Sequence, residues 1–215
     1  MPEGDEIDPG DADLAEVIVY TGKVAVLSKL SNEASKSAQA SKLISDSMSR
    51  AVIVKANTAF LSNPATDPGP AGLLNLPGIT DGGPLGSNLD ALVDAFTLIE
   101  SDGGNASHII AAPDAWAALA KLKAATGSNA PLLGASTGQA QGRNVFGVPV
   151  LNCAQAPAGS LVVVDKSDLI AAVGAVTLAV SDHFYFGSDS EAMRVTFRFG
   201  AKAVHPARVV KLRTA

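Results

Sequence analysis

Three histidines and one cysteine are the residues of this chain best suited to catalysis or metal binding. Asp182 and His183 are adjacent and resemble half of an acid–base pair, and His205 follows later in the chain. A metal site needs three or four ligands with recognisable local spacing. His108, His183 and His205 are too widely separated to give that spacing. The sequence therefore predicts no metal site, and each histidine is expected to be a strand or loop residue.

Cys153 is the only residue that would make a thiolate nucleophile, which requires a histidine partner or a cationic neighbour. Its flanks are Leu151-Asn152 and Ala154-Gln155, at the expected end of a strand, and they contain no cation. A small buried residue is the better interpretation.

Other catalytic patterns are missing from the sequence as well. No serine stands in a Gly-x-Ser-x-Gly elbow, and the glycine-rich stretches lack the Gly-Lys-Ser/Thr ending of a phosphate-binding loop. Directly adjacent carboxylates occur only at Asp5-Glu6, in the acidic leader. We therefore predict no catalytic residue and no cofactor, and the chain is not expected to be an enzyme. A hydrolase with unrecognised catalytic residues is the least favoured alternative.

The composition is apolar for a soluble monomer, with 47% hydrophobic and 17% charged residues. Such a chain often buries part of its aliphatic surface in an oligomer, although alanine-rich composition alone is the other interpretation. No apolar run reaches the roughly 18–20 residues of a membrane span. The amino terminus has no basic or apolar region of a signal peptide. A single cysteine excludes an intramolecular disulfide and is compatible with a reducing cytoplasm.

Charge is segregated along the chain, whose net charge is −5. Every charged side chain from Glu3 to Glu16 is acidic, and every one from Arg194 onward is basic. One interpretation is a disordered acidic leader together with a solvated basic strand face. The other is that the two ends attract each other, within one subunit or between neighbours. The basic segment is too sparse to indicate nucleic-acid binding.

A long helix is the most prominent expected element, because residues 33–61 contain no glycine and no proline. About 28 residues at 1.5 Å each give a rod of roughly 42 Å. One stripe of this helix is expected to contain Ile44, Met48, Ala51 or Val52, Lys55 and Ala59, with Ser, Lys and Gln on the other side. The apolar spacing is too loose for a coiled coil, which favours a rigid structural helix. A strand over 17–30, interrupted at Thr21-Gly22, should precede it.

Proline- and glycine-rich segments at 63–75 and 82–86 separate this helix from a second group of elements. Ser87-Asn88-Leu89-Asp90 resembles a capping box that opens a helix ending at Asp102, with Leu89, Leu92, Val93 and Phe96 buried. A buried strand over 108–112 and a helix from Pro113 follow, the helix having Lys121 and Lys123 in its last turn and Gly127 after it. Residues 126–144 form a polar loop, and the remainder reads as strands separated by an Ala-Pro-Ala-Gly turn at 156–159.

These landmarks, in this order, resemble the major capsid proteins of tailed phages, which have the Hong Kong 97-type fold. Residues 21–27 with Ser31-Asn32-Glu33 are similar to the strand that leads into that family's spine helix. The segments at 67–75, 108–113, 116–123, 146–150 and 156–159 are similar to its Gly/Pro loop, its central strand and helix, and its following strand and turn. Each motif is weak alone, and their common order over about residues 15–213 carries the resemblance.

The resemblance implies an α+β protein with a long spine helix, a peripheral β-sheet domain and an inserted α/β axial domain. The implied ranges are an acidic leader at 1–13, the peripheral domain at 14–80 and 176–215, and the axial domain at 81–175. It also implies self-assembly through hexamers and pentamers into an icosahedral shell around double-stranded DNA, without specific DNA binding. Portal, scaffold or decoration proteins would be further partners, with no membrane. The chain would be assembled in the bacterial cytoplasm and reside in the virion. An encapsulin-type compartment shell is the alternative.

Subunit contacts then become the functional residues. The loop at 126–144 would lie at the axial tip, around the centre of a capsomer, which selects Gln139, Gln141 and Arg143 as contact residues. Arg194 and Arg198 are selected on the peripheral domain.

Two departures from the family pattern lead to further expectations. The family's amino-terminal arm and extended E-loop hairpin would precede the strand at Val17, where about 15 residues stand whose charged side chains are all acidic. This predicts either a truncated or processed product or different lattice contacts. Some members form a lysine–asparagine cross-link, but no lysine precedes Lys23 and no asparagine lies at 181–184. Glu191, near the position of the family's acid, would act alone, so no covalent cross-linking is expected.

Overall fold

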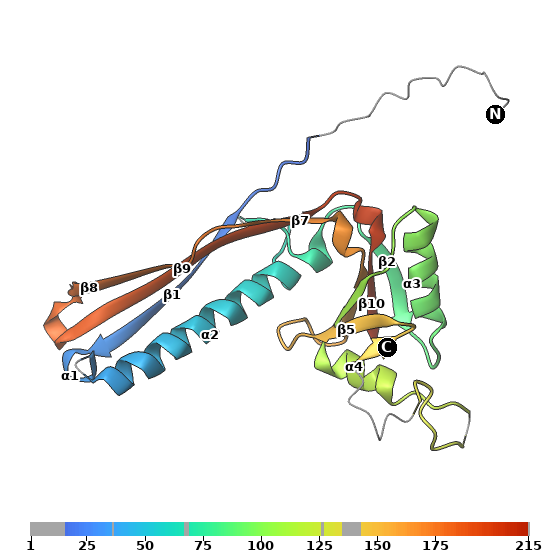
Figure 1. The fold of residues 1–215 in the computed structure, drawn as a ribbon, viewed down its shortest axis with the longest axis horizontal. Helices are drawn as coiled ribbons and strands as arrows, with labels where there is room; N and C mark the ends of the chain where they lie inside the picture. Colours follow the sequence, from blue (N-terminus) through green and yellow to red (C-terminus); the bar gives the residue numbers. More distant parts are fainter. Residues whose placement is uncertain (1–15, 36, 67–68, 126, 135–142, 215) are drawn as a thin grey trace, which may run out of the picture.

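The computed structural model describes residues 16–35, 37–66, 69–125, 127–134 and 143–214. Helices and strands form an elongated arm and a more compact lobe (Figure 1). Within the described residues, no helix has the length and apolarity needed to span a bilayer.

The arm is a four-stranded antiparallel sheet with one long helix against it. Its central strand, β9, pairs with β1 along one edge and with both β7 and β8 along the other. The strands are β1 (Gly22–Ser31), β7 (Leu169–Val173), β8 (Thr177–Tyr185) and β9 (Ser190–Ala203). The 3-10 turn η3 (Phe186–Ser188) joins β8 to β9 at the far end of the arm.

The long helix is α2 (Ala38–Ser62), and its predicted stripe is confirmed where it faces the sheet. Met48 and Val52 are buried against Val195 of β9, and Ile44 packs beside them. Lys55 donates a hydrogen bond of 3.1 Å from Nζ to the carbonyl oxygen of Ala25 on β1. The apolar stripe thus fixes which side of the rod lies on the sheet.

The single helix predicted over 33–61 is instead two helices. A short helix, α1 (Asn32–Ser35), precedes α2, and Ser37 between them has an extended backbone with φ −88° and ψ 117°. The Asn32 amide N–H donates to the Asp189 carbonyl at 3.2 Å, and its side chain also bonds to the Asp189 carboxylate. These bonds tie α1 to the β8–β9 connection and set its direction independently of α2.

The lobe contains a mixed six-stranded sheet in the order β2-β10-β6-β3-β5-β4. Its β2–β10 and β3–β5 pairs are parallel and the others antiparallel. The strands are β2 (Thr80–Leu85), β3 (His108–Ala111), β4 (Asn144–Val145), β5 (Val148–Asn152), β6 (Ser160–Val164) and β10 (Val209–Thr214).

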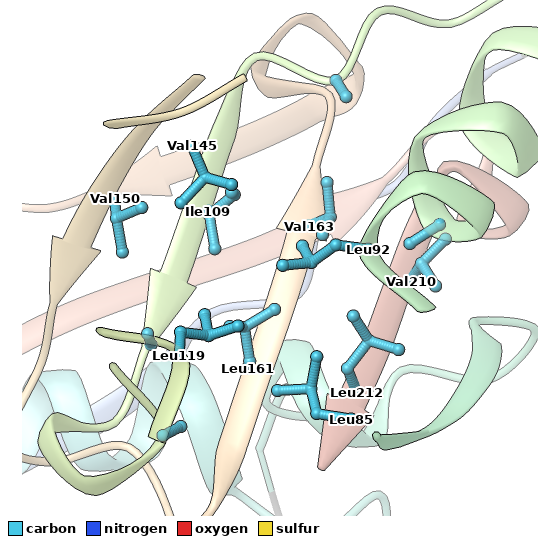
Figure 2. Close-up of a cluster of buried hydrophobic side chains, with 14 of the residues drawn as sticks. Leu85, Leu92, Ile109, Leu119, Val145, Val150, Leu161, Val163, Val210 and Leu212 are labelled. Carbon is cyan, nitrogen blue, oxygen red and sulfur yellow. The ribbon is translucent and has the colours of Figure 1, made fainter. Parts of the chain in front are cut away.

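Two helices, α3 (Asp90–Ser101) and α4 (Pro113–Ala120), cover one face of this sheet. Figure 2 shows the resulting core, in which Leu92 of α3 and Leu119 of α4 point toward Ile109, Leu161 and Val163 of the strands. All five are at most 1% exposed. The period-two alternation of β6 sends Leu161 and Val163 to this side.

The opposite face of β6 joins the lobe to the arm. Val162 and Val164 are buried there with Leu61, from the end of α2, and with Leu73 of the 3-10 turn η1 (Leu73–Asn75). Asn75 Nδ2 donates to the carbonyl oxygens of Ser62 and Asn63 at 3.0 and 3.1 Å. The second core and these caps fix the helix end against the sheet.

Four local predictions are corrected. Strand pairing starts at Gly22, so residues 17–21 are not strand. Leu89 is the N-cap of α3 and no side chain caps the helix, because the Asn88 side chain bonds to Asp90 instead. Val93 is 45% exposed because it points away from the sheet. Helix α4 ends at Ala120, so Lys121 and Lys123 lie beyond its last turn.

The predicted domain ranges do not coincide with the two sheets. Leu169–Val173, from the range 81–175, pairs with β9 in the arm. Val209–Thr214, from the range 176–215, pairs with β2 and β6 in the lobe. Both strands pair with partners far away in the sequence, and local periodicity carries no information about such pairing.

Candidate functional site

The residues with catalytic potential do not converge. His183 Nε2 lies 3.4 Å from Asp182 Oδ1, but the two side chains are 90% and 75% exposed. Cys153 is half-buried, not fully buried as predicted, since it packs at the rim of the second core with Sγ 3.5 Å from Gln155 Oε1. No group of three potential metal-ligating side chains occurs in the described part of the chain.

The sequence analysis did not predict a network of charged side chains at the boundary between arm and lobe. Asp168 accepts a hydrogen bond of 3.1 Å from Arg208 Nη1, and its other oxygen lies 2.9 Å from His205 Nδ1. Arg208 Nε also donates to Asp102 at 3.0 Å. Burial lowers the pKa of Arg208, but the hydrogen bonds and charges of Asp102 and Asp168 outweigh it and raise this pKa.

The positions of Asp102, Asp168 and Arg208 indicate that their network stabilises the fold. Asp102 follows the last residue of α3, Asp168 ends the 3-10 turn η2 (Lys166–Asp168), and Arg208 ends the turn η4 (Pro206–Arg208). The Asp168 carbonyl also accepts from Val204 N–H at 2.8 Å. These contacts hold the ends of β9 and α3 together where β10 enters the lobe. Residues so distant in sequence leave no local motif.

The pocket with a volume of about 680 Å³ lies where residues 18–23, the loop at 69–71 and the end of β9 meet. Its described lining is mainly apolar, with Lys23 and Lys202 as the charged residues. No acid and base converge among its described lining residues, which therefore do not form a catalytic centre of the kinds considered above.

The more informative surface is the outer strand of the arm. Strand β8 pairs with β9 through Thr177–Ser181 and Tyr185, and no other described strand pairs with its second edge. Such open edges are usually blocked or covered. Apolar side chains on and beside β8 are exposed by 54–84%: Val173, Val176, Leu178, Val180, Phe184 and Phe186. We call this group the apolar edge.

The apolar edge continues the buried surface of the arm. Leu178 opposes Val195, and Val180 opposes Met193. Val195 and Met193 pack against α2 on this face, since directly opposed residues of an antiparallel pair share a face. Leu178 and Val180 therefore extend an apolar face beyond the reach of the helix, and monomers rarely leave such a contiguous patch exposed.

The predicted contact residues lie in two places. Arg143 is exposed at the start of β4, and its guanidinium carbon is 6.0 Å from the ring centroid of Trp116 on α4. Arg194 and Arg198 are exposed on the face of β9 that points away from α2. Gln139 and Gln141 lie outside the described residues.

The arrangement of a long helix on an elongated sheet, an attached lobe and an uncovered edge can be compared with known proteins. The sequence matches the phage capsid family over residues 2–214. This chain belongs to the phage capsid family. It is therefore a structural capsid protein of a bacteriophage virion, and the family is not an enzyme family.

Chains in several solved structures share the fold of this phage capsid protein. A structure titled Gordonia phage Cozz has a TM-score of 0.74 at 19% identity, covering 98% of this chain and 79% of that one. The capsid of a native GTA particle has a TM-score of 0.75 at 17% identity, covering 99% and 81%. Mycobacterium phage Adephagia gives 0.69 at 14% identity, covering 100% and 82%. No curated protein sequence matches the chain.

Proposed function

We propose that this chain is a major capsid protein with the Hong Kong 97-type fold that assembles through hexamers and pentamers into an icosahedral shell. The shell encloses double-stranded DNA without specific binding and is assembled in the cytoplasm of the bacterial host. The observation that carries the proposal is the apolar edge, which no described part of the same chain covers. A surface of this kind is buried when copies of the arm meet.

The arm and the lobe support the proposed division into two domains. We assign the arm, with α2 as spine helix, to the peripheral domain and the lobe to the axial domain. Strand β7 then belongs to the peripheral domain and β10 to the axial domain, because each pairs within that sheet. Peripheral domains bury the apolar edge against neighbours, and axial domains meet around capsomer centres.

Arg143 and the loop that precedes it form the proposed contact between axial domains, together with Gln139 and Gln141. Arg143 is exposed beside Trp116 of α4, where a neighbour's polar groups can reach it. Replacing Arg143 with Glu should weaken ring closure, because like-charge and unpaired-charge contacts oppose docking. Size-exclusion chromatography should show fewer capsomers, with Lys121→Glu in the same lobe as control. An unchanged elution profile would contradict this placement.

Negative-stain electron microscopy of the purified full chain tests the proposal as a whole. Closed particles of uniform diameter are expected, and boiling in detergent should release monomers, since no covalent cross-link is expected. A sample that remains monomeric at all concentrations would refute self-assembly. Bound nucleic acid in particles isolated from phage-producing cells distinguishes a genome shell from an encapsulin-type protein container, which no observation on the described residues favours.

A further inference from the structure

The end of the arm farthest from the lobe presents aromatic side chains to solvent (Figure 1). Residues 181–189, which we call the arm tip, comprise the end of β8, the turn η3 and the residue before β9. Phe184 and Phe186 of the arm tip are 66% and 84% exposed. Aromatic side chains displayed in this way are typical anchors of protein interfaces.

Hydrogen bonds hold the arm tip in one shape. Ser188 Oγ donates to the Tyr185 carbonyl at 3.1 Å, and Ser190 Oγ donates to the Ser188 carbonyl at 2.8 Å. Asp189, which has a left-handed φ of 45°, accepts bonds from Asn32 of α1 through both its carbonyl and its carboxylate. A turn fixed in this way loses little conformational freedom when its aromatic rings enter a partner, so docking costs less free energy.

The apolar pocket of about 680 Å³ lies at the opposite end of β9 from the arm tip. Its walls include Ile18 and Tyr20, which are both exposed, and Leu76 before the lobe begins. An apolar cavity of roughly 150 Å³ holds one benzene ring. The volume of this pocket therefore suffices for the rings of both Phe184 and Phe186.

The arm tip and the pocket carry opposite charges. The charged residues of the described pocket lining are Lys23 and Lys202, which are exposed and form no ion pair with a described carboxylate. The arm tip contains Asp182 and Asp189 but no lysine or arginine. These aspartates flank the two phenylalanines, so aromatic rings seated in the pocket bring carboxylates toward its lysines. Complementary charge of this kind favours one docking orientation over others.

One copy cannot place its own arm tip in its own pocket. Strand β9 runs from Ser190, next to the arm tip, to Ala203, which lines the pocket. Its 14 residues span roughly 44 Å at about 3.4 Å per step. Pairing with β1 and packing against α2 keep this strand extended. The pocket that receives the arm tip must therefore belong to another copy.

We propose that the arm tip of one copy docks in the apolar pocket of a second copy. Phe184 and Phe186 fill the pocket, and the aspartates of the arm tip face its two lysines. This inference rests on the proposed function, because shell assembly supplies the second copy, and it names the surface that buries these two residues of the apolar edge. Contacts between unlike surfaces run head to tail and close into a ring when the rotation from copy to copy permits.

Carbodiimide cross-linking of the assembled full chain tests this contact. The reagent joins carboxylates to lysine amines only when they are in contact. We expect mass spectrometry to find Asp182 joined to Lys23 and Lys202, and only background joining to the exposed lobe lysines Lys121 and Lys166. When equal amounts of normal and heavy-nitrogen copies are assembled together, mixed-isotope pairs should be as frequent as same-isotope pairs.

The outcomes separate the inference from the proposed function. Particles that form without cross-links from the arm tip overturn the inference and leave shell assembly intact. Cross-links between copies in a sample without closed particles support the contact and count against the shell. A sample with neither counts against both. Lys23 and Lys202 joined instead to carboxylates from elsewhere in the chain would give the pocket a different occupant and overturn the inference.

Removing an aromatic anchor provides the first matched test. Phe186→Ser should lower the yield of cross-links from Asp182 to Lys23 and Lys202 roughly tenfold, because the ring no longer fills the pocket. Its urea midpoint should stay unchanged, since the side chain is exposed. Leu43→Ser on α2, at 66% exposure, removes an exposed apolar side chain elsewhere on the arm and should leave the cross-links unchanged. Equal cross-link yields in the two variants would overturn the proposal.

Charge exchange provides the second test. Lys202→Glu should lower the yield of cross-links from Asp182 to Lys23 several-fold, because like charges then face each other. Lys121→Glu makes the same change of net charge in the lobe and should have no effect. Mixing the Lys202→Glu chain with an Asp182→Lys chain should give cross-links between the amine introduced at 182 and the carboxylate introduced at 202. No cross-link of this kind in the mixture would overturn the proposal.

Discussion

The lobe and the arm differ in how much of their apolar surface a single chain covers. In the lobe, α3 and α4 pack on one face of the sheet and the end of α2 packs on the other. In the arm, α2 covers part of one face, and the cluster buried beneath it consists of Met48, Val52 and Val195. A body with so little core of its own gains stability mainly from further contacts.

For the proposed shell, this contrast indicates which part of the subunit gains free energy on assembly. The lobe has already buried Leu92, Ile99 and Ile109 to 0% exposure, so it has little left to gain from a neighbour along that core. On the arm, Val176 and Phe186 remain 62% and 84% exposed. A partner that binds only the folded chain stabilises the folded state. Contact between subunits in the proposed shell therefore stabilises the arm more than the lobe.

The largest expected effect comes from breaking α2. Ile53 lies in the middle of this helix, and a proline there removes a backbone hydrogen bond and clashes with the preceding turn, at a cost of about 3 kcal/mol or more. Because the arm has no other cover, Ile53→Pro should abolish soluble folded protein. Ile53→Ala is the control, since the side chain is 57% exposed. Equal urea midpoints for the two variants would show that the arm does not depend on α2.

Cavity variants compare the two cores directly. Leu161, at 0% exposure in the lobe, should lose about 2–5 kcal/mol of unfolding free energy when replaced by alanine. Met48→Ala in the arm should fall near the lower end of that range, because part of the surrounding surface is open to water. Urea denaturation measures both. A larger loss for Met48→Ala would reverse the comparison.

Acid should weaken the boundary between lobe and arm through Asp165, which directly follows β6. Burial raises the pKa of Asp165, but hydrogen bonds from Ser167 and from the Asn105 amide, with the charge of Arg208, outweigh it and hold this pKa below 3.8. The unfolded chain therefore binds the proton more readily. The stabilisation is present above pH 3.8 and is lost as pH falls through the lowered value.

The variant Asp165→Asn lacks this titration. Its unfolding free energy should be lower than that of the unmodified chain at neutral pH, and the difference should shrink in acid. Denaturation at several pH values measures this difference. A difference that stays constant with pH would exclude Asp165 as a source of the acid sensitivity.

The smallest effect on folding is expected at the apolar edge. Leu178 is 54% exposed, so Leu178→Thr should change the unfolding free energy by no more than about 0.5 kcal/mol. The same variant should reduce particle yield in light scattering. Leu98→Gln on α3, at 44% exposure, is the matched control in the lobe and should leave the yield unchanged. Equal yields for both variants would remove the apolar edge from the proposed interface.

Local patterns in the sequence predicted the local structure of this fold well. The stripe of α2, the strand beginning at His108 and the helix beginning at Pro113 follow from periodicity and from proline placement. The break at Ser37 was not predicted, because it depends on bonds between Asn32 and Asp189, 157 residues apart. The order of motifs also predicted the family, which the sequence match confirms.

Long-range pairing and surface contacts were harder to predict. Nothing local in Val209–Thr214 distinguishes a strand of the lobe from a continuation of the arm, and only the pairing with β2 and β6 decides it. The network of Arg208 was not predicted for the same reason, since Asp102 and Asp168 are far from Arg208 in the sequence. The contact roles of Arg143, Arg194 and Arg198 stay predictions, because they concern copies beyond the single chain.

The position of β10 sets an order of events during synthesis. This strand lies between β2 and β6, so β2 has no partner in the sheet and β6 pairs only with β3 until residues 209–214 have left the ribosome. The hairpin of β8 and β9, made earlier, is complete before the lobe can close. A nascent chain interrupted before residue 209 would therefore expose the apolar edge without a finished lobe, and fragments with such exposed apolar surface are prone to aggregate.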